Sequence, residues 1–423
     1  MTRIGIECES TESPETWGVG RIVNKLLENI AARPELINEF RFFLYFKSHI
    51  PDLPYLNNPI FVKKIVGPNS FSLYYYIFLP VKLWFEKLDL VFFPNYMLPI
   101  LFHGESLFIL TEDIYYEIRR FDLRLRYKLA YKIFAEWWAA RHASKIMAIS
   151  ETSRCELTKL FKISPDRIVV NTLGIDLPKI PPTNYKLPLL RPAFTKVSSG
   201  KQGFAGQATT NYLLYVGQAF PRRHLRETML AFEVLASNAT SYKLPLLRPA
   251  FTKVSSGKQG FAGRATTNYQ LVAVGKDKYN PPIIEKLKNE INSRLGRNAI
   301  IYKEYVSEEE LAQLYAGAKL LIYVSSKEAF GLPPLEALSY GIPAVVADQD
   351  VTREIFSTHA FFVANPDDPD SITSAIRDGL TEDTKRQEIK NASAGILEKY
   401  TWQKNTDRFL EIIRNFMMKK AAH

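Results

Sequence analysis

Only two cysteines, Cys8 and Cys155, occur in the 423 residues, and they lie far apart in the chain. This scarcity excludes a disulfide scaffold and favours a reducing compartment. The chain also lacks an uninterrupted apolar run long enough to cross a bilayer, and its first residues lack the apolar core of a signal peptide. We therefore expect a cytoplasmic protein of ordinary globular composition, with 46% hydrophobic and 23% charged residues.

Acidic residues are absent from two near-identical stretches, 185–212 and 242–269, which differ only at Gln207 and Arg264. Of the net charge of +11, the lysines and arginines of these copies contribute nine, which leaves +2 for the rest of the chain. The basic balance is therefore a property of the repeat, which argues against a nucleic-acid-binding protein. We expect no nucleic acid partner. Salt-sensitive oligonucleotide binding that survived removal of both copies would contradict this.

The repeat copies are interpreted as two in-frame insertions of one element. Excising 185–212 and 243–269 leaves connections of normal length between the flanking strands and helices. Each copy has several glycines, two prolines and a Ser-Ser pair, so each should protrude with little packed core of its own. A basic adaptor for lipid or a partner, and a duplication introduced during sequencing or assembly, are the alternatives.

The first part of the chain predicts the start of a doubly wound α/β domain. Residues 4–7 form an apolar strand, and Gly18-Val-Gly20 then opens a helix that is apolar on one face. A plain tight turn is the alternative interpretation of Gly18 and Gly20. Ser150 is expected to cap a later helix that runs through Leu160. Further strands are expected at 42–46, 90–93, 107–110 and 145–149.

The most informative stretch runs from Ser325 to Gly341. It follows an apolar run, residues 320–324, that predicts a buried strand, and it ends in a helix-stop signal. Pro333 or Pro334 suits the first position of a short helix. The stretch is therefore a loop that feeds a helix N-terminus.

Backbone donors and two carboxylates surround this helix start. Because the prolines have no N–H, Phe330, Gly331 and Leu332 hold the donors that can face an anion, and the helix dipole adds to the attraction. Glu328 in the loop and Glu336 on the helix flank this anion site from two sides. The structural alternative is that Glu336 is a solvated helix residue and Glu328 a loop charge.

A second phosphate-binding pattern precedes this stretch in the chain. Residues 213–217 predict a strand that ends in a turn at Gly217, and a basic segment then enters a helix. Arg222 and Arg223 are the candidate cations for an anionic ligand.

The string Glu-Ala-Phe-Gly-Leu-Pro-Pro-Leu-Glu, residues 328–336, closely resembles the Glu-x7-Glu motif of retaining glycosyltransferase family 4. Arg223 then takes the position of the family's diphosphate-binding lysine, so the resemblance makes Arg223 the preferred cation and Arg222 the weaker choice. Gly18 and Gly20 take the position of the family's glycine loop. Asp113 matches a family aspartate at a strand end and is a further site candidate.

Three departures from the family's pattern stand beside these matches. Glu112 replaces a usual histidine, Gln218 a usual arginine, and Ala329 a usual glycine. These departures motivate the alternative function, a catalytically inactive nucleotide-sugar-binding scaffold of a polysaccharide-assembly complex.

The resemblance implies a GT-B fold, in which two Rossmann-like domains face a cleft and a C-terminal helix returns to the N-terminal domain. The implied divisions are an acceptor-side domain 1–176, a linker 177–212, a donor-binding domain 213–400 with 242–269 as an inserted loop, and a returning helix 401–423. The resemblance implies transfer of a hexose with retention, from a nucleotide-diphosphate sugar to a hydroxyl of a glycan or lipid-linked saccharide. Glu328 would orient the sugar and Glu336 would bind the ribose.

No cofactor and no metal site are expected. The donor is expected to be GDP-mannose, by similarity to mannosyltransferases of surface-polysaccharide assembly, with UDP-glucose or a UDP-hexosamine next. Residues 348–350 imitate an Asp-x-Asp metal motif and are interpreted as a turn.

Residues 119–142 predict a helix that mixes arginine and lysine with aromatic side chains. We interpret it as an amphipathic helix whose cations extend to solvent. The alternative is a face that rests on anionic lipid at the inner surface of the membrane, which would suit a lipid-linked acceptor.

Overall fold

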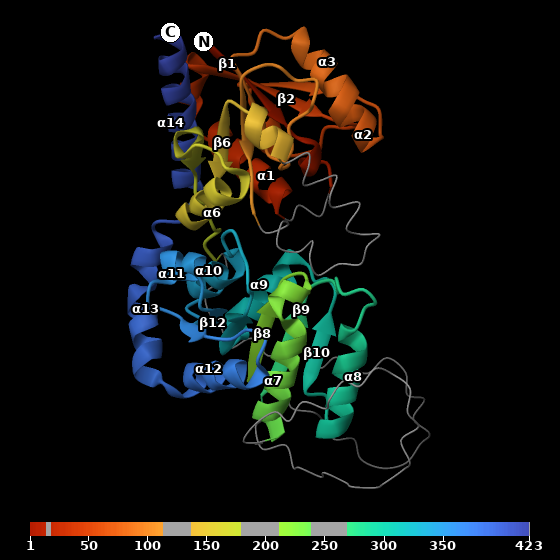
Figure 1. Ribbon diagram of the computed structural model, residues 1–423, viewed down its shortest axis with the longest axis vertical. Helices are drawn as coiled ribbons and strands as arrows, with labels where there is room; N and C mark the ends of the chain where they lie inside the picture. Colours follow the sequence, from red (N-terminus) through yellow and green to blue (C-terminus); the bar gives the residue numbers. More distant parts are fainter. Residues whose placement is uncertain (14–17, 113–136, 179–210, 238–268, 423) are drawn as a thin grey trace. The chain divides into compact units, whose positions relative to one another are not determined.

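The computed structural model describes residues 1–13, 18–112, 137–178, 211–237 and 269–422 (Figure 1). These residues divide into two compact units. The first unit comprises residues 1–176, 328–330 and 398–423, and the second comprises residues 177–327 and 331–397. In the described part of the chain, no helix is both long and apolar enough to cross a membrane.

Three of the sequence-based interpretations concern residues outside the described ranges. They are the site candidate Asp113, residues 119–136 of the predicted aromatic helix, and the repeat copies up to residues 210 and 268. The last residues of each copy are described, and they are considered below.

The first unit is built on a seven-stranded sheet in the order β3-β2-β1-β4-β5-β6-β7, with every neighbouring pair parallel. The strands are β1 (Thr2–Glu7), β2 (Phe40–Phe46), β3 (Phe61–Ile65), β4 (Leu90–Phe93), β5 (Ser106–Ile109), β6 (Lys145–Ala148) and β7 (Ile168–Val170). The five strands predicted from apolar runs are confirmed within two residues. Strand β3 was not predicted, because Lys63 and Lys64 interrupt its apolar pattern.

Helices of the first unit begin where the sequence signals a start. Gly18, with φ of +63°, precedes α1 (Val19–Ala31), whose apolar face is buried as expected. The Ser150 side chain accepts a hydrogen bond from Ser153 N at the start of α6 (Glu151–Phe161). Residues 71–84 form one helix in three segments, α2 (Phe71–Leu73), the π-helical turn η4 (Tyr74–Phe78) and α3 (Leu79–Trp84).

The last helix, α14 (Trp402–Ala421), packs in the first unit, as the fold class requires. It lies against α1, and the rings of Phe409 and Phe92 meet edge to face at 5.0 Å. Asn405 Nδ2 donates to the carbonyl of Thr172 at 2.7 Å. Residues more than two hundred positions apart therefore share one core.

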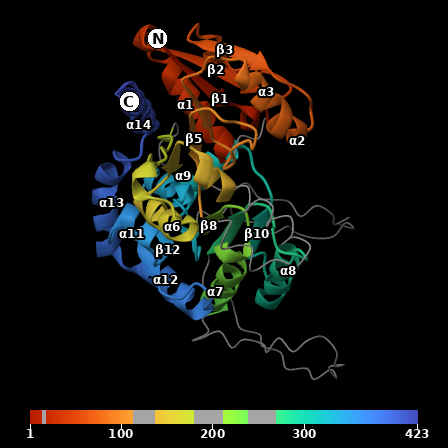
Figure 2. The ribbon, with the colours of Figure 1, turned by 45° about the horizontal axis from the view of Figure 1, so that its top comes forward.

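The second unit repeats the same strand order in a six-stranded parallel sheet, β10-β9-β8-β11-β12-β13. The strands are β8 (Tyr212–Val216), β9 (Gln270–Val274), β10 (Ile300–Lys303), β11 (Leu320–Tyr323), β12 (Ala344–Ala347) and β13 (Phe361–Val363). The helices are α7 (Leu225–Ser237), α8 (Ile284–Leu295), α9 (Glu308–Gly317), α10 (Leu332–Ser339), α11 (Asp350–Phe356), α12 (Pro369–Thr381) and α13 (Asp383–Leu397). Helix α7 lies beside α8 and α12, while α10 packs against β11 and β12 (Figures 1 and 2).

Both sheets therefore have the Rossmann-like strand order. From a central pair of strands, the earlier strands follow one another toward one edge of the sheet and the later strands toward the other edge. The central pair is β1 and β4 in the first unit and β8 and β11 in the second. Doubly wound proteins bind ligands outside the carboxyl ends of this central pair. The predicted α/β class with two such domains is confirmed.

Each repeat copy leads into the amino end of a strand of the second sheet, and the two strands are neighbours. Tyr212, the last residue of the first copy, opens β8 and pairs with Gln270, which follows the second copy and opens β9. Tyr212 is fully buried, and its hydroxyl donates to the carbonyl of Leu314 at 2.7 Å. The insertion boundary at residue 212 is therefore wrong by at least one residue, because Tyr212 belongs to the sheet.

We expect a variant lacking residues 185–211 and 242–268 to unfold at the same temperature as the full chain or higher. Shorter connections cost less closure entropy, and this excision keeps the buried tyrosine. Thermal unfolding followed by circular dichroism measures the difference.

The matched control lacks residues 185–212 and 242–268, so that it differs only by the loss of Tyr212. It should be less stable than the first variant, because it loses a buried ring and a buried hydrogen bond. A fall of more than about 5 °C in the first variant would contradict the insertion interpretation.

Candidate active site

A cation and two glycines meet at the carboxyl ends of β8 and β11. The Arg223 guanidinium carbon lies 5.6 Å from the centroid of the Tyr323 ring, at the last residue of β11. Gly217 follows β8 with φ of +140°, and a methyl group added there would lie 3.1 Å from Arg223 Nη1 and 3.5 Å from Tyr323 Cε2. A side chain at residue 217 would therefore displace the guanidinium.

The start of α10 reaches the other side of the same tyrosine ring. Gly331 precedes the helix with φ of +102°, and a methyl group added to it would lie 3.9 Å from Tyr323 Cε1. Leu332 is the first helical residue and Pro333 the second. Three predicted site residues that are distant in sequence, Gly217, Arg223 and Gly331, are thus gathered around Tyr323.

The carboxylate of Glu336 is held by a buried tyrosine. Glu336 lies on α10, and its Oε2 accepts a hydrogen bond of 2.9 Å from the Tyr315 hydroxyl of α9. The Tyr315 ring stacks on Tyr340, with centroids 5.6 Å apart and planes 16° apart. A hydroxyl donor of this kind fixes the direction of the carboxylate. The solvated-residue alternative for Glu336 does not account for this contact.

Arg222 is placed differently from Arg223. It is 5% exposed, and its Nη1 donates to the carbonyl of Lys327 at 3.2 Å. Its own carbonyl accepts from the Ser326 N–H at 2.8 Å. Arg222 therefore ties the loop before Glu328 to the segment that carries Arg223.

The loop residues 328–330 group with the first unit. Glu328 is 8% exposed. The carbonyl of Ala329 accepts a hydrogen bond of 2.7 Å from Ser150 Oγ, and the Phe330 ring lies edge to face with Tyr400 at 5.4 Å. Phe330 thus has a packing role beside its predicted N–H. The Ala329 departure is accommodated, because the side chain is buried without positive φ.

Glu112 and Gln218, the other two departures, lie in unlike surroundings. Glu112 is fully buried, and its Oε2 accepts from Ser153 Oγ at 2.7 Å. Gln218 is exposed and follows Gly217 directly. In the first unit, Gly18 adopts positive φ and Gly20 is buried in α1.

Sequence reasoning missed a polar cluster at the central strand pair of the first sheet. Glu7 ends β1 and is 1% exposed. Its Oε2 accepts from Asn95 Nδ2 at 2.6 Å, and its Oε1 lies 2.8 Å from Glu9 N and 3.0 Å from the Tyr74 hydroxyl. Tyr96 has φ of +57°, a conformation that is uncommon for non-glycine residues.

Burial raises the pKa of the Glu7 carboxyl to about 8, although the hydrogen bonds from Glu9, Tyr74 and Asn95 oppose the shift. The available signal was an acidic residue at the end of an otherwise apolar strand. Burial and a shifted pKa outside the carboxyl ends of a central strand pair are features of ligand sites.

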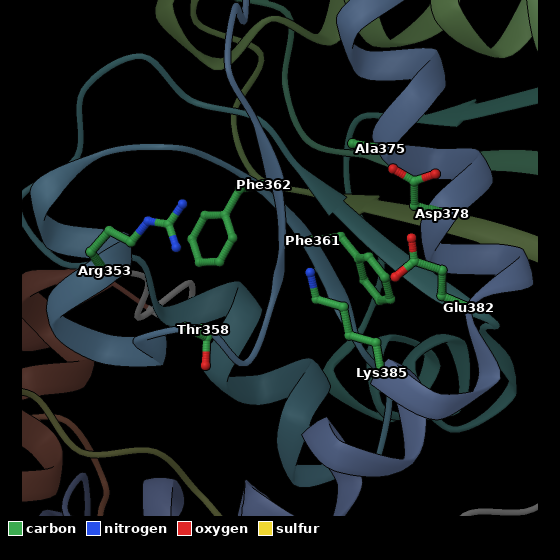
Figure 3. A pocket seen from close by; sticks show the side chains of 8 residues that line it. All are labelled: Arg353, Thr358, Phe361, Phe362, Ala375, Asp378, Glu382 and Lys385. Carbon is green, nitrogen blue, oxygen red and sulfur yellow. The ribbon is translucent and has the colours of Figure 1, made fainter.

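The second unit also has a separate hollow of about 280 Å³. Its lining residues, shown in Figure 3, are Arg353, Thr358, Phe361, Phe362, Ala375, Asp378, Glu382 and Lys385. The Arg353 guanidinium lies 3.5 Å from the Phe362 ring centroid and pairs with Asp348 at 2.6 Å. None of the predicted site residues lines this hollow.

The Asp-x-Asp segment, residues 348–350, precedes and begins a helix. Asp348 pairs with Arg353, while Asp350 begins α11 directly after the N-cap residue Gln349.

Comparison with known proteins identifies the domain that carries Arg223 and Glu336. Residues 201–395 match the family described as "Glycosyl transferases group 1". This part of the sequence is therefore similar to the group 1 glycosyl transferases.

Sequence relatives of the chain include named mannosyltransferases. The chain is 30% identical over 265 residues to O-antigen chain mannosyltransferase B of Escherichia coli. The aligned residues cover 62% of this chain and 58% of that protein. It is 40% identical over 81 residues to O-antigen chain mannosyltransferase RfbU of Salmonella typhimurium, covering 19% of this chain and 23% of the relative. The matches therefore span less than two thirds of the length of these curated relatives.

Solved structures share the fold of the whole chain. WaaG, titled a glycosyltransferase involved in lipopolysaccharide biosynthesis, aligns with a TM-score of 0.65 at 16% identity over 98% of this chain and 99% of its own. HepE of Anabaena, solved in complex with UDP and glucose, aligns with a TM-score of 0.63 at 15% identity over 98% of this chain and 100% of its own. The two Rossmann-like domains thus have the GT-B fold of these structures.

The stability of the protein should fall as the pH rises through the range in which Glu7 titrates. The folded state holds this proton up to a pKa of about 8, whereas the usual value is 4.5. The contribution of the carboxyl to the free energy of unfolding is therefore fully present below about pH 4.5 and is lost as the pH approaches about 8. Urea unfolding at several pH values measures this slope.

The Glu7→Gln variant should show a flatter dependence of unfolding free energy on pH between about 5 and 8. The exposed Glu411→Gln on α14 is the matched control and should keep the slope of the parent. An identical slope in Glu7→Gln and the parent would show that the carboxyl is not held protonated.

Proposed function

We propose that the protein is a retaining glycosyltransferase. It moves a hexose, with mannose the first candidate, from a nucleotide-diphosphate sugar to a hydroxyl of a glycan or a lipid-linked saccharide. The observation that carries the proposal is the arrangement of Arg223, Gly217 and Gly331 around Tyr323, at the carboxyl ends of the central strands of the second sheet. A cation beside open backbone and a helix start is a site for a diphosphate.

The reaction requires charge to develop on the leaving diphosphate. The bond between the anomeric carbon and the phosphate oxygen breaks, and its electron pair leaves with the phosphate. The acceptor oxygen bonds the carbon, and the hydroxyl proton passes to the departing phosphate, directly or through solvent. Arg223 and the N–H groups of Gly331 and Leu332 stabilise the developing charge. The chain needs no cofactor for this step, and the cation that meets the diphosphate is its own arginine rather than a metal.

The two carboxylates of the motif have separate tasks in this proposal. Glu336, aimed by the Tyr315 hydroxyl, binds the ribose hydroxyls of the donor. Glu328 orients the donor sugar, and Asp113 belongs to the acceptor side. Phe330 and Arg222 support the loop, whereas Gly18 and Gly20 keep the start of α1 open to the substrate.

GDP-mannose is the donor we propose first. The names of the sequence relatives, which are mannosyltransferases of O-antigen chains, support this choice. UDP-glucose or a UDP-hexosamine comes next, since HepE was solved with UDP and glucose. The relatives' names also favour a glycan or lipid-linked acceptor. We propose that the protein works in the cytoplasm, where its two free thiols are stable, and contacts the inner face of the membrane peripherally.

Arg223→Ala and Glu336→Ala should each lower the rate of transfer by at least about a hundredfold, because each removes a group that meets the donor. Initial rates with GDP-mannose and a saccharide acceptor measure the loss. Arg294→Ala is the matched control. Arg294 lies in the last turn of α8, which runs away from the carboxyl ends of the strands, and it should keep the parent rate.

A third variant separates positioning from contact in this site. Tyr315→Phe removes only the hydroxyl that aims Glu336, so it should raise the KM for the donor several-fold while kcat changes little. Full activity in both alanine variants would remove the assignments of Arg223 and Glu336.

A panel of nucleotide sugars tests the donor directly. Slow hydrolysis of GDP-mannose in the absence of acceptor should exceed that of UDP-glucose and of UDP-hexosamines, because the enzyme stabilises the leaving diphosphate even when water is the acceptor. Tight binding of a donor with no hydrolysis and no transfer across an acceptor panel would instead favour the inactive scaffold.

A further inference from the structure

A group of large apolar side chains lies exposed on the first unit. Among the described residues, fourteen large hydrophobic side chains are exposed, and eight of them fall between residues 73 and 101. We name these eight the apolar patch: Leu73, Ile77, Phe78, Val81, Trp84 and Phe85 on or beside the helix of residues 71–84, and Ile100 and Leu101 on a following loop. Phe85 is 83% exposed and Trp84 is 54% exposed. Large exposed apolar groupings usually mark interaction sites.

The helix beneath the patch is apolar on both faces. Its inward side chains, Tyr74, Tyr75, Leu79 and Leu83, belong to the core of the first unit. A surface helix normally pairs one apolar face with a polar one, whereas a helix that is apolar all round is one that becomes covered. In Figures 1 and 2 this helix, drawn as α2 and α3, lies along the outside of the first unit.

Two hydrogen bonds fix the arrangement of the helix and the loop that carry the apolar patch. The Tyr75 hydroxyl donates to the carbonyl of Met97 at 2.6 Å, and Trp84 Nε1 donates to the carbonyl of Leu101 at 3.1 Å. These bonds join the helix to the loop that carries Ile100. The exposed side chains therefore form one fixed surface.

The charges that border the patch are positive where they are exposed. Lys82 and Lys87 are exposed beside Trp84 and Phe85. The two acids of residues 71–104 are only half exposed and are engaged. Glu86 pairs with Lys64, and Asp89 Oδ2 accepts from the Arg3 N–H at 2.8 Å. An anionic surface thus meets lysines first.

The outward face of this helix is mostly apolar. Its exposed polar side chains are Ser72 and Lys82, and Trp84 Nε1 already donates to the carbonyl of Leu101 within the chain. Protein interfaces carry about one hydrogen bond per 100–200 Å², so a face with so few polar side chains favours a lipid partner over a protein. A lipid bilayer needs only apolar side chains, interfacial aromatic rings and border cations.

We propose that the apolar patch inserts into the interfacial layer of an anionic lipid bilayer. Phe78, Trp84 and Phe85 lie at the level of the headgroups and upper acyl chains, while Lys82 and Lys87 contact acidic headgroups. The proposed lipid contact rests on the proposed function in one respect, because a lipid-linked acceptor would lie in the same membrane. The expectation of lipid contact from residues 119–142 concerned another segment.

The test is co-sedimentation of the full chain with vesicles of phosphatidylcholine alone and with added phosphatidylglycerol. The parent should bind the anionic vesicles, and the variant F78S/F85S should bind them at least about tenfold more weakly. Both side chains are exposed, so the variant should fold. Met418→Ser is the matched control, since Met418 is 63% exposed on α14 outside the patch, and it should bind as the parent does.

The charge contribution has its own variant. K82Q/K87Q should weaken binding to the anionic vesicles and leave the weak binding to neutral vesicles unchanged. Absence of vesicle binding by the parent, or equal binding by F78S/F85S, would overturn the proposal. A self-associated parent that binds no vesicles and becomes monomeric in F78S/F85S would assign the patch to a second copy.

Donor hydrolysis in solution separates this proposal from the enzymatic one. F78S/F85S should hydrolyse GDP-mannose without acceptor at the parent rate, because the patch is on the first unit and the diphosphate site on the second. If the protein binds vesicles but does not hydrolyse GDP-mannose, the lipid-binding proposal stands and the proposed activity is wrong.

Discussion

The arrangement at the carboxyl ends of β8 and β11 depends on a guanidinium that occupies the space a side chain would take. Arg223 lies against residue 217, where only the absence of a side chain leaves room for it, and Tyr323 supports both. Gly217 and Gly331, on two sides of the ring, both have positive φ, which side chains rarely adopt. Arg222 then ties the loop before Glu328 to the segment beside Arg223. The cation, the open backbone and the helix start are consequences of the same local geometry.

The two sheets use one strand order for two chemistries. Outside the central pair of the second sheet lies a cation, Arg223. Outside the central pair of the first lies a buried acid, Glu7, bound to Asn95. A cation suits a phosphate, whereas a carboxyl group suits hydroxyls. The same scaffold thus provides complementary polarity in its two domains, as an enzyme that joins a phosphate-activated donor to a hydroxyl acceptor would need.

Much of the fold could be predicted because local signals agree with it. Apolar runs located most of the strands, Gly18 and Ser150 marked helix starts, and the motif between residues 325 and 341 marked α10. Strand β3 escaped because its lysines break the apolar pattern. The helix at residues 71–84 was not predicted, because an apolar run without a polar face shows no helical period.

The site was only partly predictable. Arg223, Gly217 and Gly331 carry motif signals, so sequence could place them together. Tyr323, Tyr315 and Asn95 act through neighbours that only folding supplies, and nothing local distinguishes them from core residues. Tyr212 shows the same limit, because a repeat boundary drawn from sequence identity ignored a hydrogen bond to residue 314.

The position at which the repeat copies re-enter the second sheet has a further consequence. Both rejoin it at the amino ends of β8 and β9, whereas Gly217 lies at the opposite end of β8. The length of the chain before the amino ends of β8 and β9 can therefore vary without a change in the geometry of the residues at their carboxyl ends. The two junctions are therefore natural places to graft a fluorescent reporter or an affinity handle.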